Sequence, residues 1–201
     1  MPGGKDRVYV ALFWTRGSNP ARYANQGAGE SEEGRKQTDI FSPRYHWGFC
    51  ICPKHENNGA ITGSAYRVET MAGMQSLRDY PLDQVHNNPD RLLGRILIAK
   101  TGDKPGVENI ISDPKYLGAA IALQTQWDER NWMAVVVQAL KDDQERGGSV
   151  SSMIGQRWSY IRVVARRYVR TEIEHGRYCW PFDAKEPVPT LCLFENRVLT
   201  P

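Results

Sequence analysis

The segment from Arg44 to Pro53 contains the side chain best suited to chemistry in this chain, the imidazole of His46. The segment alternates between two sets of residues, as a β-strand with one buried face does. One set is Tyr45, Trp47, Phe49 and Ile51, and the other is His46, Gly48, Cys50 and Cys52. We expect the aromatic set to pack on a core and the small-residue set to leave room for a ligand or a helix. A histidine in that position is either a catalytic group or a buried side chain with satisfied hydrogen bonds.

A second strand is predicted at 63–69, after the turn sequence K-H-E-N-N-G, so that the two strands form a hairpin. Tyr66 and Val68 would face one side of this strand and Arg67 the other. His46 and Arg67 would then lie on neighbouring strands. An imidazole and a guanidinium together can polarise a carbonyl group or hold a carboxylate, and the imidazole can act as a general acid or base.

Further elements are needed to hold these strands in place. They are predicted strands at 7–14 and 91–99, short helices or turns at 105–113 and 114–123, and longer helices at 128–143 and 151–175. Asp128 suits the N-cap of the first long helix and Gly176 the C-cap of the second, whereas the valines at 135–137 are also typical of a strand. Residues 70–90 lack a regular pattern and are predicted to be irregular. This order predicts an α+β fold with a mainly antiparallel sheet packed by helices, the first long helix crossing it with Trp132 near His46.

The length of 201 residues predicts a single domain covering 1–201. Residues 15–43 are rich in Gly, Ser, Asn, Glu and Arg and are predicted to be a long loop insertion, which is either a lid or an insertion without function. Residues 177–201 contain several prolines and are predicted to run as an extended tail across the surface.

The composition argues against several classes of function. A net charge of +3 is too small to indicate nucleic-acid binding. No apolar run is long enough to span a membrane and the polar start is unlike a signal peptide, so we expect a cytoplasmic protein without a membrane partner. The cysteines at 50, 52, 179 and 192 and the four scattered histidines lack metal-site spacing, and no glycine-rich nucleotide motif occurs. Neither a metal nor a cofactor is therefore predicted, and the sequence does not specify an oligomeric state.

The helix predicted at 151–175 has an apolar stripe on one side and arginines on the other. The arginines are Arg157, Arg162, Arg166, Arg167 and Arg170. Such a face can contact phosphate groups, but Glu172 and Glu174 dilute its positive charge. A solvated helix surface is the simpler interpretation.

The order of these motifs resembles an uncharacterised fungal family of proteins of similar length. The matching motifs are V-Y-V-A-L at 8–12, Y-H-W at 45–47, L-L-G-R-I-L-I-A-K at 92–100, Asn131 with Ala139-Leu140, and V-P-T at 188–190. That family is in turn similar to circularly permuted papain-like proteins of the NlpC/P60 and lecithin-retinol-acyltransferase types. The resemblance implies a strand histidine beside a cysteine nucleophile at the start of a helix, where the helix N-terminus lowers the pKa of the thiol.

This chain departs from the family pattern at the implied active site. In the frame set by Asn131, the nucleophile position is occupied by Trp132, and the second histidine position by Arg67. Only His46 is kept, so thiol catalysis is not expected. The indole is expected to reshape the pocket into one that binds a small molecule between aromatic side chains. The candidate binding residues are Trp132, Trp47, Tyr66, Asn131 and Trp127, and each aromatic among them is alternatively a core residue.

Three hypotheses about function follow. The preferred one is a small-molecule enzyme of the secondary-metabolite type on a papain-like scaffold that has lost its nucleophile. In it, His46 and Arg67 would carry out a cyclisation, isomerisation or elimination by non-covalent acid–base chemistry. The second is a catalytically inactive binding or scaffold protein of the same fold. The third is a module that binds an anionic partner or nucleic acid through the arginine-rich helix, and it is the least favoured.

Overall fold

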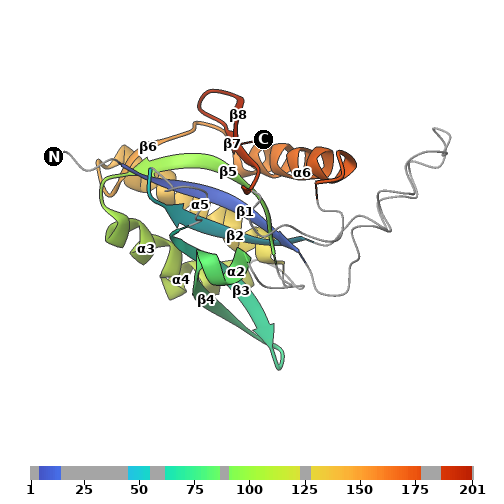
Figure 1. The fold of residues 1–201 in the computed structure, drawn as a ribbon. Coiled ribbons are helices and arrows are strands. Elements are labelled where there is room, and N and C mark those ends of the chain that lie inside the picture. The colour runs from blue at the N-terminus through green and yellow to red at the C-terminus, as the bar shows by residue number, and fades with distance from the viewer. Residues whose placement is uncertain are drawn as a thin grey trace.

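A computed structural model describes residues 5–14, 45–54, 62–86, 91–122, 128–177 and 187–200 (Figure 1). Its strands are β1 (Asp6–Trp14), β2 (Tyr45–Cys52), β3 (Ser64–Met71), β4 (Met74–Pro81), β5 (Leu92–Thr101), β6 (Val150–Met153), β7 (Thr190–Cys192) and β8 (Arg197–Thr200). Its helices are α2 (Leu82–His86), α3 (Lys104–Ser112), α4 (Pro114–Ala122), α5 (Glu129–Glu145) and α6 (Trp158–Glu174). The loop insertion predicted at 15–43 lies outside the described residues.

The described strands form one sheet in the order β4–β3–β2–β1–β5–β7–β8, with β6 paired to β5. Neighbouring strands are antiparallel except for β5 and β7, which run parallel. The predicted hairpin is present, because β2 and β3 pair with Gly48 opposite Arg67. The expectation of a mainly antiparallel sheet packed by helices is therefore confirmed.

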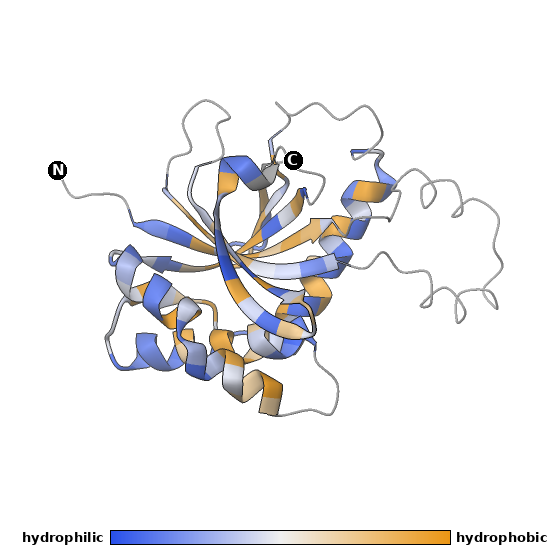
Figure 2. Ribbon diagram, turned by 90° about the horizontal axis from the view of Figure 1, so that it is seen from below, coloured by the Kyte–Doolittle hydropathy of each residue, from blue (hydrophilic) through white to orange (hydrophobic). Residues whose placement is uncertain are grey.

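The two faces of the sheet have different coverings. The aromatic face of β2 joins the larger core, where Trp47 and Phe49 pack with residues of α5 and α6, while Cys50 and Cys52 belong to a second cluster on the opposite face. Figure 2 shows the larger helices gathered on one side of the strands. The alternation in the sequence of β2 therefore predicts correctly which of its residues face each side of the sheet.

The long helices begin and end for identifiable reasons. The carboxylate of Asp128 accepts the backbone N–H of Arg130, which makes it the N-cap of α5 as predicted. Gly176 adopts a φ of 78° just after α6, the left-handed conformation that commonly ends a helix. The valines of α5 are helical because Val136 and Val137 are buried against the sheet and this packing outweighs their preference for strands.

Three sequence predictions are corrected by the structure. The segment 70–90 is not irregular where it is described, because 74–81 forms β4 and 82–86 forms α2. The helix predicted from 151 begins at Trp158, and 150–153 instead pairs with β5. The tail does not simply cross the surface, since β7 is buried in the sheet beside β5. For β6 and β7, pairing with β5 decides the conformation, and β5 is distant in sequence, so local periodicity does not report it.

The N-cap of α3 gives a prediction about pH. Asp103 accepts hydrogen bonds from the hydroxyl of Ser149 (2.7 Å) and the backbone N–H of Gly106 (3.1 Å), and these hold its pKa below the ordinary value of 3.8. A lowered carboxyl pKa stabilises the fold above the unfolded-state pKa, and this stabilisation is lost as the pH falls through the folded-state pKa. Ser149→Ala should therefore reduce stability at neutral pH, by an amount that shrinks in acid. Urea denaturation across a pH series measures the difference.

Ser151→Ala is the matched control for this prediction. The hydroxyl of Ser151 donates to the backbone carbonyl of Lys100, which does not titrate. Any loss of stability in Ser151→Ala should therefore be independent of pH. A pH-independent loss in Ser149→Ala as well would contradict the assigned role of Asp103.

Candidate functional site

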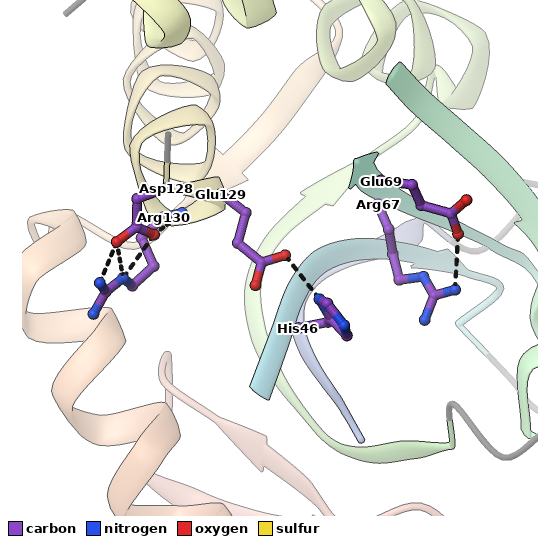
Figure 3. A network of polar contacts seen from close by, with 6 residues as sticks. All are labelled: His46, Arg67, Glu69, Asp128, Glu129 and Arg130. Atoms are coloured by element: carbon purple, nitrogen blue, oxygen red, sulfur yellow. Dashed lines mark hydrogen bonds and ion pairs between the residues drawn. The ribbon is translucent and has the colours of Figure 1, made fainter. Parts of the chain in front are cut away.

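His46 lies near the start of β2, and its ring reaches the N-terminus of α5. Its Nδ1 is 3.4 Å from Oε2 of Glu129, which lies 83 positions further along the chain (Figure 3). The side chain of His46 is 45% exposed and that of Glu129 is 17% exposed. The imidazole is therefore accessible to small molecules, while the carboxylate that orients it is mostly covered.

Arg67 is held in a buried cage of aromatic and acidic side chains. Its guanidinium lies 5.0 Å from the ring centre of Phe13 and 5.3 Å from that of Tyr80. Nη2 is 3.2 Å from Oε1 of Glu69, and the hydroxyl of Tyr80 donates to the same oxygen at 2.6 Å. These contacts fix the position of the positive charge, since both rings and the carboxylate favour the same site for it.

His46 and Arg67 share one face of the sheet. Gly48 is opposite Arg67, and His46 precedes Gly48 by two positions, so the alternation of β2 assigns His46 to the same face of the hairpin as Arg67. Figure 3 shows each side chain beside its own carboxylate, His46 beside Glu129 and Arg67 beside Glu69. The two side chains that the sequence selected as catalytic therefore lie on neighbouring strands, each with its own carboxylate partner.

The predicted binding aromatics lie in the core of the other face. The ring of Trp132 packs edge-on against Phe49, with centroids 5.4 Å apart, and Trp47 packs in the same way on Trp158 at 5.4 Å. The hydroxyl of Tyr66 donates to Glu108 on α3 at 2.5 Å. All three predicted residues are buried. Phe49 and His46 alternate on β2, so these aromatics pack on the face of the strand opposite to Arg67, although the His46 ring reaches Glu129 at the start of the same helix as Trp132.

The start of α5 contains two polar atoms that the fold does not satisfy. Nε1 of Trp132 and Nδ2 of Asn131 are buried, and neither has a hydrogen-bond partner among the described residues. Trp132 is fully buried, so its indole N–H is lost from water without compensation. Trp127, the remaining predicted aromatic, lies outside the described residues.

The phenol groups of Tyr66 and Tyr80 stay protonated at neutral pH. Burial, together with the hydrogen bond to Glu69, raises the pKa of Tyr80. Burial and the hydrogen bond to Glu108 likewise raise the pKa of Tyr66. Both hydroxyls therefore serve as hydrogen-bond donors to carboxylates and not as bases.

Residues 5–200 match the model of one protein family, DUF6914, which is described as a family of unknown function. The chain belongs to this family. No curated protein and no solved structure matches the chain.

Two further properties of this DUF6914 protein concern metals and membranes. Among the described residues, no group of three or more His, Cys, Asp and Glu side chains is arranged to hold a metal ion. No helix in the described ranges is long and apolar enough to cross a membrane.

Sequence reasoning missed the acidic residues of the site. Glu129 follows the predicted N-cap Asp128, and an acidic first turn is favoured by the helix dipole alone, so nothing marked it as a partner of His46. Glu69 carried a usable signal, because it lies two residues after Arg67 on the same strand and so shares its face. Tyr80 could not be found because the strand that carries it was not predicted.

Proposed function

We propose that this protein is a cytoplasmic enzyme that moves protons on a small organic substrate without a covalent intermediate, with His46 as the general acid or base. The observation that carries the proposal is the contact between His46 and Glu129, formed between residues 83 positions apart. The substrate class is a small metabolite with a carbonyl or carboxylate group. The reaction class is an isomerisation, cyclisation or elimination of the kind found in secondary metabolism.

The histidine–carboxylate pair supports a defined division of roles. In the neutral tautomer with the proton on Nδ1, this N–H donates a hydrogen bond to Glu129, and Nε2 is the basic nitrogen. Glu129 also stabilises the imidazolium that forms once His46 has taken a proton from the substrate. A separation of 3.4 Å is long for a hydrogen bond, but such contacts shorten when substrate is bound.

Arg67 supplies fixed positive charge on the same face. Proton removal next to a carbonyl group places negative charge on the carbonyl oxygen, and a preorganised guanidinium stabilises that charge without reorganising. The cage of Phe13, Tyr80 and Glu69 provides this preorganisation. Arg67 therefore acts by electrostatic stabilisation and His46 by proton transfer.

A permuted papain-like origin remains part of the proposal. It is supported by a strand histidine beside the N-terminus of a helix, the arrangement that the resemblance implies. In this chain the helix residue that reaches His46 is the carboxylate of Glu129, at the first position of α5, three residues before Trp132. Loss of the thiol would then have been accompanied by a change from covalent to acid–base chemistry.

Deuterium incorporation tests the proposal on many candidate substrates at once. The purified protein is incubated in D2O buffer with a library of small ketones, aldehydes and carboxylic acids, and each compound is examined by mass spectrometry. An enzyme that removes a proton from carbon adds solvent deuterium to its substrate or product, even when the reaction leaves the elemental composition unchanged. His46→Gln should lower the labelling rate by about 10²–10⁴-fold, the usual contribution of a general base.

His175→Gln is the matched control, because His175 is an exposed histidine at the end of α6. The His175→Gln variant should incorporate deuterium into the substrate at the wild-type rate. Circular dichroism and thermal unfolding establish that both variants fold. Equal labelling by His46→Gln and the wild type would contradict the role of His46, and the absence of any labelled compound would count against catalysis.

Glu129→Gln tests the pairing separately. We expect a lower measured pKa for His46 in this variant, because the neutral amide no longer favours the imidazolium. The acidic limb of the labelling rate, where protonated His46 can no longer accept a proton, should move with it. NMR titration of the His46 ring measures the change. An unchanged titration would show that Glu129 does not stabilise the imidazolium form of His46.

A binding protein without catalytic activity is the second candidate function. An inactive binding or scaffold protein is supported by the burial of Trp132, Trp47 and Tyr66, because the aromatics expected to contact a substrate are instead packed in the core. It predicts that no compound of the library acquires deuterium with the wild-type protein.

A further inference from the structure

Helix α6 has an outer face whose side chains are exposed in the part of the chain that the structure describes. Its inner face packs on the sheet through Ile161, Ala165, Tyr168, Val169 and Ile173. The outer face carries Tyr160, Val163, Arg167 and Arg170, which are spaced three or four residues apart and are all exposed. Tyr160 is 46% and Val163 60% exposed, so two apolar side chains lie within an arginine-rich surface. In Figure 1 this helix runs along one side of the molecule.

The basic character of α6 is concentrated in one part of the helix. From the N-cap Arg157 to Thr171 the charged residues are five arginines, with no aspartate or glutamate. Arg170 pairs with Glu174 at 2.9 Å, and Arg162 interacts electrostatically with Asp128 of α5. The other three arginines, at 157, 166 and 167, have no carboxylate within ion-pair distance among the described residues.

The start of α6 adds to this positive potential. Its N-cap Arg157 makes no side-chain capping hydrogen bond, and its first turn contains no acidic residue. The partial positive charge of the helix N-terminus is therefore not balanced by a carboxylate from the cap or the first turn. This is the opposite of the usual placement, in which acidic residues gather at the start of a helix.

We propose that the outer face of α6 binds an acidic segment of a protein partner. Carboxylates of the partner would pair with Arg167 on this face and with Arg157 and Arg166 at its margins, because planar guanidinium groups match the geometry of carboxylates. An apolar residue of the partner would cover Tyr160 and Val163. Arginine and tyrosine are enriched in protein–protein interfaces, and they contribute most when they lie close together around an apolar centre.

The charge pattern favours an acidic protein segment over a nucleic acid. Glu174 is exposed at the C-terminal end of the basic surface, so a phosphate backbone that continued along the helix would meet like charge there. A short acidic segment ends before that point. The apolar centre at Tyr160 and Val163 also has no counterpart in a row of phosphates.

Fluorescence anisotropy with defined probes tests this interface on the full-length protein. The probes are a short glutamate-rich peptide with a central leucine, the same peptide with glutamine in place of glutamate, and an oligothymidylate of similar length. The acidic peptide should bind, and the triple variant Arg157→Ala, Arg166→Ala and Arg167→Ala should weaken that binding by about tenfold or more. Tyr160→Ala should weaken it as well.

A second triple variant controls for net charge. Arg78→Ala, Arg146→Ala and Arg197→Ala remove the same charge from exposed positions on other elements, and this variant should keep its affinity for the acidic peptide. An equal loss of affinity in both triple variants would overturn the proposal in favour of nonspecific attraction. Tighter binding of the oligothymidylate would identify a nucleic-acid surface instead, and no binding of the acidic peptide at low salt would exclude α6 as its docking site.

Discussion

Replacing Trp132 with cysteine should destabilise the protein by about 3–5 kcal/mol, the range found when a large aromatic is truncated in a core. Trp132 is fully buried and packs edge-on against Phe49. The new thiol would sit in an apolar environment on the opposite face of β2 from His46. We therefore expect restoring the cysteine of the papain-like pattern to produce an inert thiol. Urea denaturation and the rate of labelling by a disulfide reagent measure the two effects.

The labelling rate separates a buried thiol from a nucleophile. If the thiol is buried, its labelling should follow the unfolded fraction as urea is added, and combining Trp132→Cys with His46→Gln should not change it. The parent chain is labelled in parallel, because it contains its own four cysteines. Rapid labelling without urea that depends on His46 would show that the indole occupies a functional nucleophile position. Trp132→Phe keeps an aromatic ring at this position and should be the milder substitution.

Gly48→Ala should cost about 3 kcal/mol, the upper end of the usual penalty for overpacking. A Cβ atom at Gly48 would lie 2.3 Å from the backbone oxygen of Tyr66 and 3.0 Å from side-chain atoms of Arg67 and Phe13. The first contact is with the neighbouring strand itself, so β2 and β3 would have to separate. Because Arg67 lies across this glycine, the substitution should also displace the guanidinium. Chemical denaturation measures the first effect and the deuterium-labelling rate the second.

Gly118→Ala is the matched control for this substitution. Gly118 is exposed within α4, and a Cβ atom there would contact nothing within 4 Å. Alanine should instead raise stability by about 0.5–1 kcal/mol, because glycine is a poor helix former. If Gly48→Ala were as harmless as Gly118→Ala, the close packing of Arg67 over β2 would be disproved.

The sequence was sufficient for elements with a strong local pattern. The alternation in β2 assigned Trp47 and Phe49 to the core face and placed His46 and Cys50 opposite them. The capping residue Asp128 located the start of α5. In these places the hydrophobic pattern and the local backbone chemistry agree, so little information from the rest of the fold is needed.

Elements stabilised by strand pairing or by distant contacts, and not by a buried face of their own, could not be read in this way. β4 is an edge strand with mostly exposed or partly buried residues, and pairing with β3 stabilises it more than burial does. Likewise, the contact of His46 with Glu129 depends on where α5 begins relative to β2, which neither segment encodes alone. The sequence supplied the side chains for a site, but the carboxylates that complete it were identified only from the packing.

The parallel pairing of β7 with β5 has a consequence for how the chain folds as it is synthesised. β1 through β5 can assemble by antiparallel contacts once residue 101 has been made, but β7 begins only at Thr190. Until then, the part of β5 that β7 covers, Arg95 to Leu97, presents an open hydrogen-bonding edge of the kind that templates aggregation, whereas β6 pairs with the end of β5 earlier. A chain cut short before Thr190 would keep most of its secondary structure yet lose this cover. We expect such a truncation to be detected first as insolubility and only secondarily as a loss of structure.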